Sequence, residues 1–271
     1  MLCGFVMLIS NRKTNRPIHL YGMISVRYLS QNKPEGAGKK MFSLDERLAL
    51  CASFVRNGTA LADVGTDHAY LPVYLALQRK IRSAVACDVR TGPLENARGN
   101  IARFGVEAIV STRLSDGLQE VAPEEAEDIV MAGMGGELIV RLIEETPWLT
   151  DPDRRLILQP MTKPDVLRQY LCAHGFCLLQ EKACLSMGKA YSVMVCAYDG
   201  RIRPCSITFA RTGFLLQDSS PEAEAYLRLV LSKLQKERKG LPLDSPAASQ
   251  HMALIETISN RLTPDPKEET T

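Results

Sequence analysis

The sequence predicts an α/β protein built on a mostly parallel sheet, followed by a smaller helical part. Between Ala60 and Pro160, four short apolar runs each end in a turn, and amphipathic or small-residue stretches of helical length separate them. After Tyr198 the alternation stops and only helical periodicity remains. Strands that alternate with helices form a parallel sheet covered on both faces. We therefore expect a ligand at the carboxyl ends of the strands.

Each expected element has a local signal. Ser43 and Glu46 form a capping box that begins the first helix, and Asn57-Gly58 ends it. The apolar runs predict strands at 60–64, 83–89, 126–133 and 154–160, and the stretches between and after them predict helices at 71–80, 93–104, 137–145 and 164–174. Asp116, in the run RLSDGL, marks the end of a further strand.

The last part of the chain predicts a helical hairpin. Ser220-Pro221 and Ser245-Pro246 each begin a helix with a stripe of aliphatic residues along one face. A short connection joins the two helices, so we expect them to pack together as a coiled-coil-like pair. Four basic residues crowd the end of the first helix: Lys233, Lys236, Arg238 and Lys239. This basic cluster is either a surface that follows nucleic-acid phosphates or an ordinary solvated helix face.

Composition excludes several classes of protein. The chain has 271 residues, of which 45% are hydrophobic and 24% charged, and no apolar run approaches the ~20 residues of a membrane span. These values predict one full domain with a smaller appendage, in a cytoplasmic protein that does not enter a membrane. The formal net charge of +2 means that any nucleic-acid contact comes from a local basic cluster. The eight cysteines are scattered without a C-x-x-C pair, which suits reduced thiols, and we expect no metal site.

Residues 1–40 differ from the rest of the chain. They contain no acidic residue before Glu35, show no sustained periodicity and end in the loop-like run NKPEGAGKK. We expect an unstructured extension or an overlong start before Met41; an organellar presequence is the alternative, because basic residues and serines accompany few acids. The other expected divisions are a cofactor-binding domain at 41–200 and a helical domain at 201–271.

Acidic residues stand near three successive strand ends. Gly65 follows the first strand, where it permits a tight turn and a close approach of the backbone to a ligand. Asp88 ends the next strand about 20 residues further on, where an acid can accept both ribose hydroxyls, and Asp116 stands where an adenine amino group needs an acceptor. Such acids suit the cationic cofactor S-adenosylmethionine, whereas Asp67 would repel a dinucleotide pyrophosphate. The alternative is that these are ordinary turn-forming aspartates.

Six motifs then point to one family. The runs ADVGTDHAYLP, CDVRTGPLENA, RLSDGL, DIVMAGMGGELI, LILQP and GKAYSV follow one another between Leu44 and Tyr198. In order and spacing, they resemble the bacterial tRNA adenine-N1 methyltransferases that modify position 22 of tRNA. The resemblance implies a Rossmann-like class I methyltransferase domain, S-adenosylmethionine as methyl donor and a C-terminal helical domain that helps to hold tRNA. Two features depart from the family: ACLSMGKAYSV lacks the usual acids before Gly-Lys, and residues 1–40 have no counterpart.

Together with the strand-end residues, the resemblance predicts the members of the site. The expected cofactor-binding residues are Asp63, Gly65, Asp88, Asp116, Gly117 and Gly133, and the expected catalytic residues are Asp67 and His68. The expected substrate pocket consists of Met134, Gly135, Gly136, Gln159 and Pro160. In this context the basic cluster is expected to bind tRNA, and the protein is expected to be a monomer.

Asp67 has a defined chemical task in this interpretation. A carboxylate that accepts a hydrogen bond from the exocyclic amine of adenine leaves N1 more electron-rich and stabilises the cationic product. The same carboxylate can take a proton later, if one is lost. His68 either bonds a phosphate or the base, or it only closes the turn.

The run Gly133–Gly136 carries a second chemical argument. Methyltransferases that act on exocyclic amines commonly have an Asn- or Asp-Pro-Pro-aromatic turn at this place, and this chain has Gly-Met-Gly-Gly instead. The glycines either leave room for a flat base beside the methyl donor or only permit close packing of helix and sheet.

Three functions from different classes remain. The favoured one is methylation of N1 of an adenine in tRNA. A methyltransferase for a small molecule or a protein would be favoured if the helical hairpin covered the pocket as a lid. The third is a non-catalytic RNA-binding relative, against which the intact Asp67 and cofactor residues argue.

Overall fold

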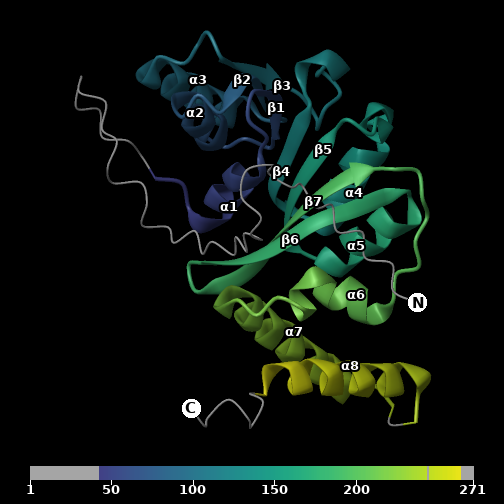
Figure 1. Cartoon of the computed structure of the whole chain (residues 1–271). Helices are drawn as coiled ribbons and strands as arrows, with labels where there is room; N and C mark the ends of the chain where they lie inside the picture. The colour runs from purple at the N-terminus through teal and green to yellow at the C-terminus, as the bar shows by residue number, and fades with distance from the viewer. Residues whose placement is uncertain (1–42, 243, 264–271) are drawn as a thin grey trace, which may run out of the picture. The chain divides into compact units, whose positions relative to one another are not determined.

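A seven-stranded sheet forms the centre of the protein. The computed structural model describes residues 43–242 and 244–263, and the predicted extension at 1–40 lies outside this part of the chain. The strands are β1 (Thr59–Val64), β2 (Ile81–Asp88), β3 (Val110–Leu114), β4 (Asp128–Gly135), β5 (Arg155–Thr162), β6 (Phe176–Ser186) and β7 (Lys189–Tyr198). Their order across the sheet is β3-β2-β1-β4-β5-β7-β6 (Figure 1). Strands β1 to β5 are parallel, whereas β7 runs antiparallel to β5 and forms a hairpin with β6.

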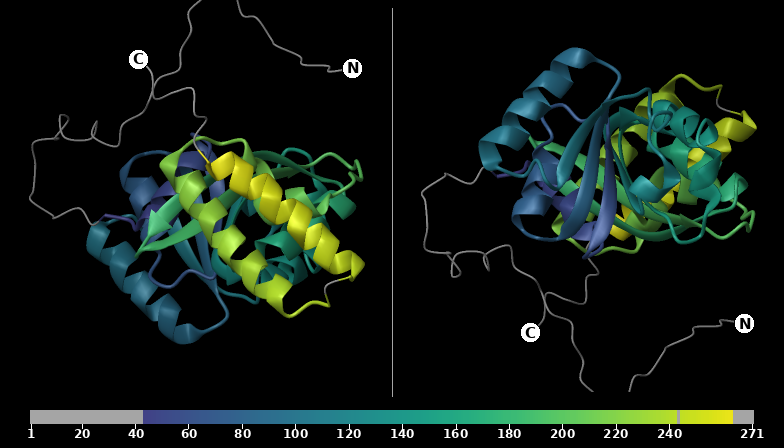
Figure 2. Two further views of the ribbon diagram at one scale, coloured as in Figure 1. Left: turned by 90° about the horizontal axis from the view of Figure 1, so that it is seen from below. Right: turned by 90° about the horizontal axis from the view of Figure 1, so that it is seen from above.

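Helices cover both faces of this sheet. One face carries α1 (Glu46–Phe54), α2 (Tyr70–Leu77) and α3 (Thr91–Phe104), and the other carries α4 (Gly136–Glu144) and α5 (Pro164–Ala173), as Figures 1 and 2 show. The 3-10 turns η1 (Pro123–Glu125) and η2 (Pro147–Thr150) lie in the connections on either side of β4 and α4. Strand β1 is buried along its whole length, as expected for a parallel strand between two helical layers. The predicted fold class is therefore confirmed.

The first helix begins differently from the prediction. Its N-cap is Asp45, not Ser43: the Oδ1 atom of Asp45 accepts a hydrogen bond from the backbone N–H of Leu48 at 2.9 Å. Because the helix begins at Glu46, Asp45 is the residue whose side chain reaches the free N–H groups of the first turn. The predicted capping box was wrong by two residues.

The two strands of the β6–β7 hairpin were not among the predicted strands. Gln180, Glu181 and Lys182 interrupt the apolar residues of β6, so its sequence lacks the continuous apolar run of a central strand. Glu181 is nevertheless only 4% exposed. Its burial depends on an arginine from α5, which a sequence pattern cannot show.

The C-terminal helices pack on this hairpin. They are α6 (Ile207–Thr212), the 3-10 turn η3 (Gly213–Leu216), α7 (Pro221–Lys239) and α8 (Pro246–Leu262). Helix α7 contacts β6 and β7, and α8 packs against α7 on the side away from the sheet (Figure 1). Ser220 and Ser245 cap the two long helices through hydrogen bonds from Ala223 N and Ala248 N. The predicted helical hairpin is confirmed.

A buried ion pair joins these helices to the rest of the protein. Arg168 of α5 donates to Glu181 Oε1 at 2.6 Å, to the carbonyl of Ala210 at 2.7 Å and to the hydroxyl of Tyr226 on α7 at 3.1 Å. The other carboxylate oxygen of Glu181 accepts the backbone N–H of Phe214 at 3.0 Å. We call this network the Arg168 node. It connects α5, β6, α6, η3 and α7.

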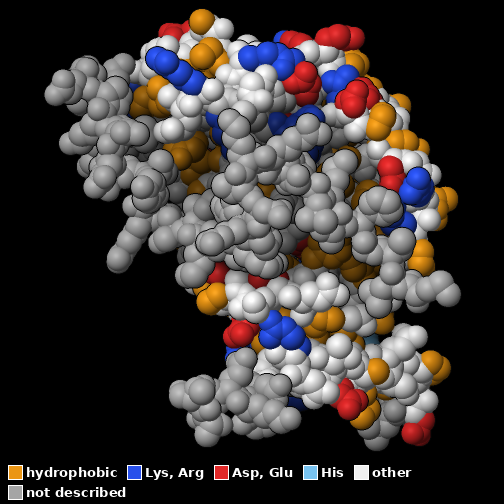
Figure 3. Space-filling view, viewed as in Figure 1, with side chains coloured by type: hydrophobic (Ala, Val, Ile, Leu, Met, Phe, Trp, Pro, Cys, Tyr) orange, Lys and Arg blue, Asp and Glu red, His pale blue; other side chains and the backbone are white. Residues whose placement is uncertain are grey.

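Charges on the face seen in Figure 3 are mixed rather than segregated. Figure 3 shows basic and acidic side chains interspersed with hydrophobic ones over the upper part of the visible face. None of the helices in the described part of the chain combines the length and apolarity needed to cross a bilayer. Within residues 43–242 and 244–263, no group of three or more metal-ligating side chains is assembled.

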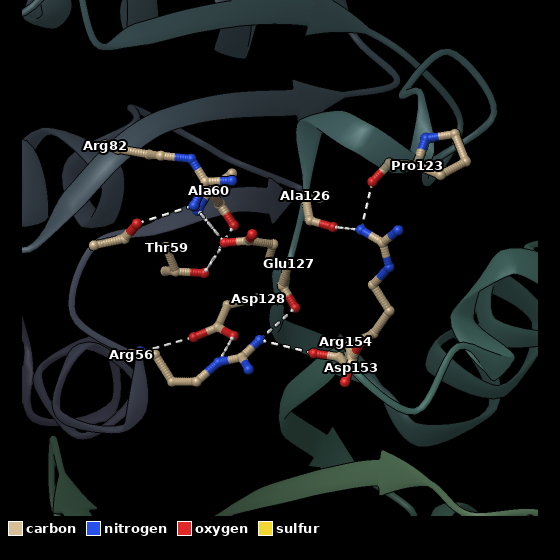
Figure 4. A network of polar contacts seen from close by, with 11 residues as sticks. Arg56, Thr59, Ala60, Arg82, Pro123, Ala126, Glu127, Asp128, Asp153 and Arg154 are labelled. Carbon is tan, nitrogen blue, oxygen red and sulfur yellow. Dashed lines mark hydrogen bonds and ion pairs between the residues drawn. The ribbon is translucent and has the colours of Figure 1, made fainter.

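A polar network closes the amino-terminal ends of β1 and β4 (Figure 4). Arg56 holds the buried carboxylate of Asp128 with two hydrogen bonds of 2.7 Å, from its Nε and its backbone N–H. The neighbouring Glu127 accepts bonds from Arg82 at 2.5 Å and from Ala60 N at 3.1 Å. The hydrogen bond from Arg82 is the main cause that lowers the pKa of Glu127 to about 2. This end of the sheet is therefore filled by its own ion pairs, and the carboxyl ends are the ones open to a ligand.

Candidate cofactor and substrate site

Two adjoining hollows lie at the carboxyl ends of the strands. One, of about 280 Å³, is lined by Asp88, Asp116, Gly117 and Met134, and we call it the Asp88 hollow. The other, of about 460 Å³, is lined by Arg47, Asp63, Asp67 and His68, and we call it the Asp63 hollow. Both are also lined by Gly65, Ala132 and Gly133. Together they form one elongated depression, which brings nine predicted site residues to the same end of the sheet.

The turn after β1 sets the centre of this depression. Gly65 has φ +74°, and a Cβ atom at this position would lie 2.3 Å from Cε of Met134. The backbone conformation therefore favours glycine, whereas the Met134 methyl group belongs to a flexible side chain that can move aside. The N–H of Thr66 bonds the carbonyl of Cys87 at 2.7 Å, and the Thr66 hydroxyl accepts the N–H of Ala69 at 3.1 Å. These bonds fix the turn against β2 and the start of α2.

Asp88 presents one carboxylate oxygen to its hollow. Its side chain is 7% exposed, and Oδ1 accepts the backbone N–H of Arg90 at 2.8 Å. The Arg90 Nε atom is also nearest to Oδ1, at 3.5 Å. Among the described residues, no hydrogen bond is formed to Oδ2. A carboxylate oxygen that lines a hollow and has no partner there is suited to accept hydroxyl groups from a ligand.

Asp116 is already engaged in an ion pair. Arg141 of α4 donates to its two carboxylate oxygens at 2.9 and 3.3 Å, and the same guanidinium also contacts Glu145. The hydrogen bonds from Arg141 lower the pKa of Asp116, so this carboxylate stays ionised. Its side chain remains 42% exposed. Arg141 thus orients the acceptor, and it was not identified from the sequence.

Asp63 is a buried acid below the second hollow. Burial raises its pKa to about 6, and a hydrogen bond with the Thr66 side chain offsets only part of this effect. A cationic ligand group placed here would favour the ionised form of the carboxylate. The position therefore suits an ammonium group.

Asp67 and His68 stand at the rim of the Asp63 hollow. The Asp67 side chain is 72% exposed and that of His68 33% exposed, with 3.4 Å between Oδ2 and Nε2. The His68 ring stacks on Tyr70 with a centroid distance of 5.0 Å, and its backbone carbonyl accepts a bond from Asn100 at 2.9 Å. Asp67 is thus accessible to a ligand, whereas His68 is held from two sides.

Arg47 is a member of the site that the sequence analysis missed. Its guanidinium donates to Gln159 Oε1 at 3.2 Å and to Met161 Sδ at 3.3 Å, and it lies 5.7 Å from the centre of the Tyr191 ring. The fully buried Gln159 uses the same oxygen to accept the N–H of Gly133 at 3.1 Å. Arg47 and Gln159 together position the Gly133 turn. A single arginine in an amphipathic helix gives no sequence signal of this role.

Comparisons with known proteins agree with this geometry. The family described as "Methyltransferase domain" matches residues 44–194. The tRNA (adenine(22)-N(1))-methyltransferase of Bacillus subtilis (strain 168) is 36% identical over 164 residues, which are 58% of this chain and 69% of that protein. The chain belongs to the tRNA (adenine(22)-N(1))-methyltransferase family. The resemblance predicted from the motifs is confirmed.

Solved structures support the same relationship for this methyltransferase. A candidate tRNA (m1A22) methyltransferase of Streptococcus pneumoniae is 34% identical, with a TM-score of 0.72. A second structure of that protein, in complex with S-adenosyl-L-methionine, is 35% identical with a TM-score of 0.68. Each covers 82% of this chain and 100% of the other.

The structure separates the predicted substrate-pocket residues of the methyltransferase. Met134 lines the Asp88 hollow, while Gly135 and Gly136 line neither of the two hollows. A Cβ atom on Gly136 would lie 2.3 Å from the carbonyl oxygen of Lys163, so this glycine permits close packing of α4. Pro160 lines a third hollow, at the side of α7.

The four residues of the basic cluster of the methyltransferase differ in their exposure. Lys233, Lys236 and Lys239 are exposed on α7, and Lys233 reaches the same third hollow as Pro160. Arg238 is half-buried and turns toward α8, where its guanidinium contacts Met252 Sδ at 3.8 Å. Three of the four cations are therefore free to meet a polyanion.

Proposed function

We propose that this protein transfers a methyl group from S-adenosylmethionine to N1 of the adenine at position 22 of tRNA. The observation that carries the proposal is the continuous depression of the Asp88 and Asp63 hollows in a member of this methyltransferase family. A relative that is 35% identical binds S-adenosyl-L-methionine, which supports the choice of cofactor.

The residues of the depression fit this cofactor part by part. In our proposal Asp88 accepts the ribose hydroxyls through Oδ2, and Asp116 accepts the adenine amino group. Asp63 faces the ammonium group of the methionine part. The turns at Gly65, Gly117 and Gly133, whose φ angles are +74°, +61° and +80°, allow the backbone to approach the cofactor closely. When bound, S-adenosylmethionine supplies an electrophilic methyl group.

Asp67 is proposed to act on the other reactant. As an exposed carboxylate at the rim, it accepts a hydrogen bond from the exocyclic amine of the target adenine. The negative charge of the Asp67 carboxylate favours attack by N1, because positive charge develops on the base as the methyl group is transferred. The Nε2 atom of His68 lies 3.4 Å from Oδ2 of Asp67, at the same rim of the hollow.

The C-terminal part is proposed to hold the tRNA. We assign the cofactor site to residues 41–200 and tRNA binding to 201–271, with Lys233, Lys236 and Lys239 along the phosphates. Within the described residues, none from α6, η3, α7 or α8 lines the Asp88 or Asp63 hollow. The helical hairpin is thus not a lid over the proposed cofactor site, and a cytoplasmic monomer would carry both parts of the tRNA site.

The assignment is tested with radiolabelled S-adenosylmethionine and unmodified tRNA transcripts. After digestion to nucleosides, we expect the label in 1-methyladenosine, and a transcript with guanosine at position 22 should remain unlabelled. Label in another nucleoside would contradict the proposed site of methylation. Tight cofactor binding without any label in tRNA would mean a different substrate.

A further inference from the structure

A third hollow, of about 370 Å³, lies between the carboxyl end of β5, strand β7 and helix α7. Its lining includes Pro160, Met161, Tyr191, Ser192, Leu229 and Lys233, and we call it the Ser192 hollow. Its volume is within the ~300–1,000 Å³ common for ligand pockets. Apolar and aromatic side chains line one part of it, and charged side chains such as Arg211 and Glu237 line another. Such a mixed lining can take a base together with its phosphate.

Ser192 gives the first indication of a ligand. The residue is 1% exposed, and its hydroxyl oxygen has no hydrogen-bond partner among the described residues. Buried hydroxyl groups are nearly always paired, because burying one unpaired is destabilising. In the Ser192 hollow, a ligand atom can supply the missing partner.

Lys233 gives the second indication, which concerns charge. Two other cations of this hollow are already paired: Arg211 contacts Asp165 at 3.5 Å and Glu237 at 3.1 Å, and Lys163 contacts Glu137 at 2.5 Å. Within the described part of the chain, Lys233 has no ion-pair partner. Asp165 and Glu237 both contact Arg211, so the charges around the hollow balance overall. The ammonium group of Lys233 is nevertheless outside these ion pairs, at the edge of the hollow, where it can contact a phosphate group.

The hollow is next to the proposed reaction site. Met161 lines both the Ser192 hollow and the Asp63 hollow. Arg47 contacts the sulfur of Met161 at 3.3 Å and also faces the Tyr191 ring. One methionine and one arginine thus stand between the two hollows, so an extended chain of nucleotides could enter both.

We propose that the Ser192 hollow binds the nucleotide next to the methylated adenine in the tRNA. This inference rests on the proposed function: since the reacting base must lie in the Asp63 hollow, the occupant of the Ser192 hollow is its neighbour. The base packs between Tyr191, Met161 and Leu229, a polar atom on its edge bonds the Ser192 hydroxyl, and Lys233 contacts the adjoining phosphate.

The first test measures the dissociation constant of unmodified tRNA for Ser192→Ala and Lys233→Ala. Ser192→Ala should weaken binding roughly 2- to 10-fold, the effect of one neutral hydrogen bond. Its melting temperature should stay the same or rise, because the hydroxyl has no partner in the free protein. Lys233→Ala should reduce the slope of log K against log salt by about 0.7–0.9.

Arg228→Ala is the matched control for Lys233→Ala. Arg228 is exposed on the same helix and is not part of the Ser192 hollow. It should leave tRNA affinity nearly unchanged. None of the three variants should change the affinity for S-adenosylmethionine, since none of these residues lines the Asp88 or Asp63 hollow.

The second test identifies the occupant. Leu229→Trp fills the hollow, and tRNAs with an abasic site on either side of adenine 22 remove one neighbouring base at a time. One of the two abasic tRNAs should bind wild-type protein at least about 5-fold more weakly, the lower limit for loss of a stacked base. Leu229→Trp should weaken binding of intact tRNA but add nothing to the loss for that abasic tRNA.

The outcomes separate the two proposals. Additive losses for Leu229→Trp and the abasic site, or no loss for either abasic tRNA, would overturn the neighbour-binding site. So would methylation at position 22 together with unchanged tRNA affinity in Ser192→Ala and Lys233→Ala. If tRNA is neither bound nor methylated, the proposed function itself is wrong.

Discussion

Ionisation of Asp63 should lower the stability of the fold and strengthen cofactor binding. Its pKa of about 6 in the folded protein lies above the ordinary value of 3.8, because burial disfavours the charge. As pH rises from about 4 to 6, the folded state keeps a proton that the unfolded chain has lost, so the free energy of unfolding falls by up to about 3 kcal/mol. Cofactor binding should instead strengthen as pH rises through about 6, because the ionised carboxylate attracts the ammonium group.

Asp63→Asn should remove both dependences. We expect the variant to unfold with a flatter pH profile between pH 4 and 6, and to bind S-adenosylmethionine more weakly than wild type at pH 7. Urea unfolding and titration calorimetry at pH 5, 6 and 7 measure the two effects. Glu95→Gln, which neutralises an exposed acid on α3, is the control. If Glu95→Gln and Asp63→Asn show the same pH profile of cofactor affinity, Asp63 does not face the cofactor.

Asp67→Asn should act on turnover rather than on cofactor binding. The amide keeps one acceptor oxygen but loses the charge that stabilises the methylated, cationic base. We expect single-turnover methylation of tRNA to slow by about 10²–10³, the effect of removing a hydrogen bond made in the transition state. The affinity for S-adenosylmethionine should change little. A parental rate would make Asp67 a turn residue and direct the search for the base-facing group to His68, which lines the same hollow.

For single residues, the sequence predicts a place in the site better for those at strand ends than for those on helices. Gly65 and Asp88 follow directly from strand ends, so their position at the hollows could be predicted. Arg47 and Arg141 come from helices, and they reach Gln159 and Asp116 only after the sheet has formed. The pKa of Asp63 likewise depends on burial that its neighbours in sequence do not determine.

Among the elements, α7 carries a prediction about salt. Replacing Lys233, Lys236 and Lys239 with Ala should flatten the salt dependence of tRNA binding by up to ~0.9 for each lost phosphate contact. Arg238→Ala is the contrasting variant, because its guanidinium turns toward Met252 of α8. It should leave the salt slope unchanged and affect the packing of the two helices. Equal salt slopes for the triple variant and wild type would mean that α7 is only a solvated face.

The central strands and the hairpin differ in how far they could be predicted. β1, β4 and β5 are buried on both faces and therefore have continuous apolar sequences. β6 lacks such a run, because its Glu181 is stabilised by Arg168 instead of by water. The start of α1 shows a different limit, since Ser43 and Asp45 are both good caps and only the path of the chain selects Asp45.

For the molecule as a whole, stability depends on the Arg168 node. Glu181→Gln would leave the fully buried guanidinium of Arg168 without its counter-charge, which costs about 3–5 kcal/mol in comparable pairs. We expect lower stability in urea and faster hydrogen exchange in α6 and α7. Glu256→Gln, which neutralises an exposed acid in the middle of α8 outside the node, should change neither. Unaltered exchange in α7 would show that the node does not hold this helix.

The order of the strands and the meeting of the hollows could not be predicted from the sequence pattern alone. Residues 47, 63 and 161 are far apart in the chain, and they line one hollow because α1 begins at the edge of the sheet where β1 and β5 end. The unpaired hydroxyl of Ser192 is likewise visible only in the folded protein, as is its place beside α7.

The Arg168 node also bears on how one adenine is selected among many. Arg168 and Glu181 are fully buried, and Tyr226 extends their network onto α7, so α7 is tied to α5 and β6 of the sheet domain. When the tRNA phosphates are bound along α7, the base that reaches Asp67 is the one at a fixed distance from those phosphates. The protein would then select its adenine by the distance of that base from the bound phosphates in the folded tRNA, and not by the surrounding nucleotide sequence.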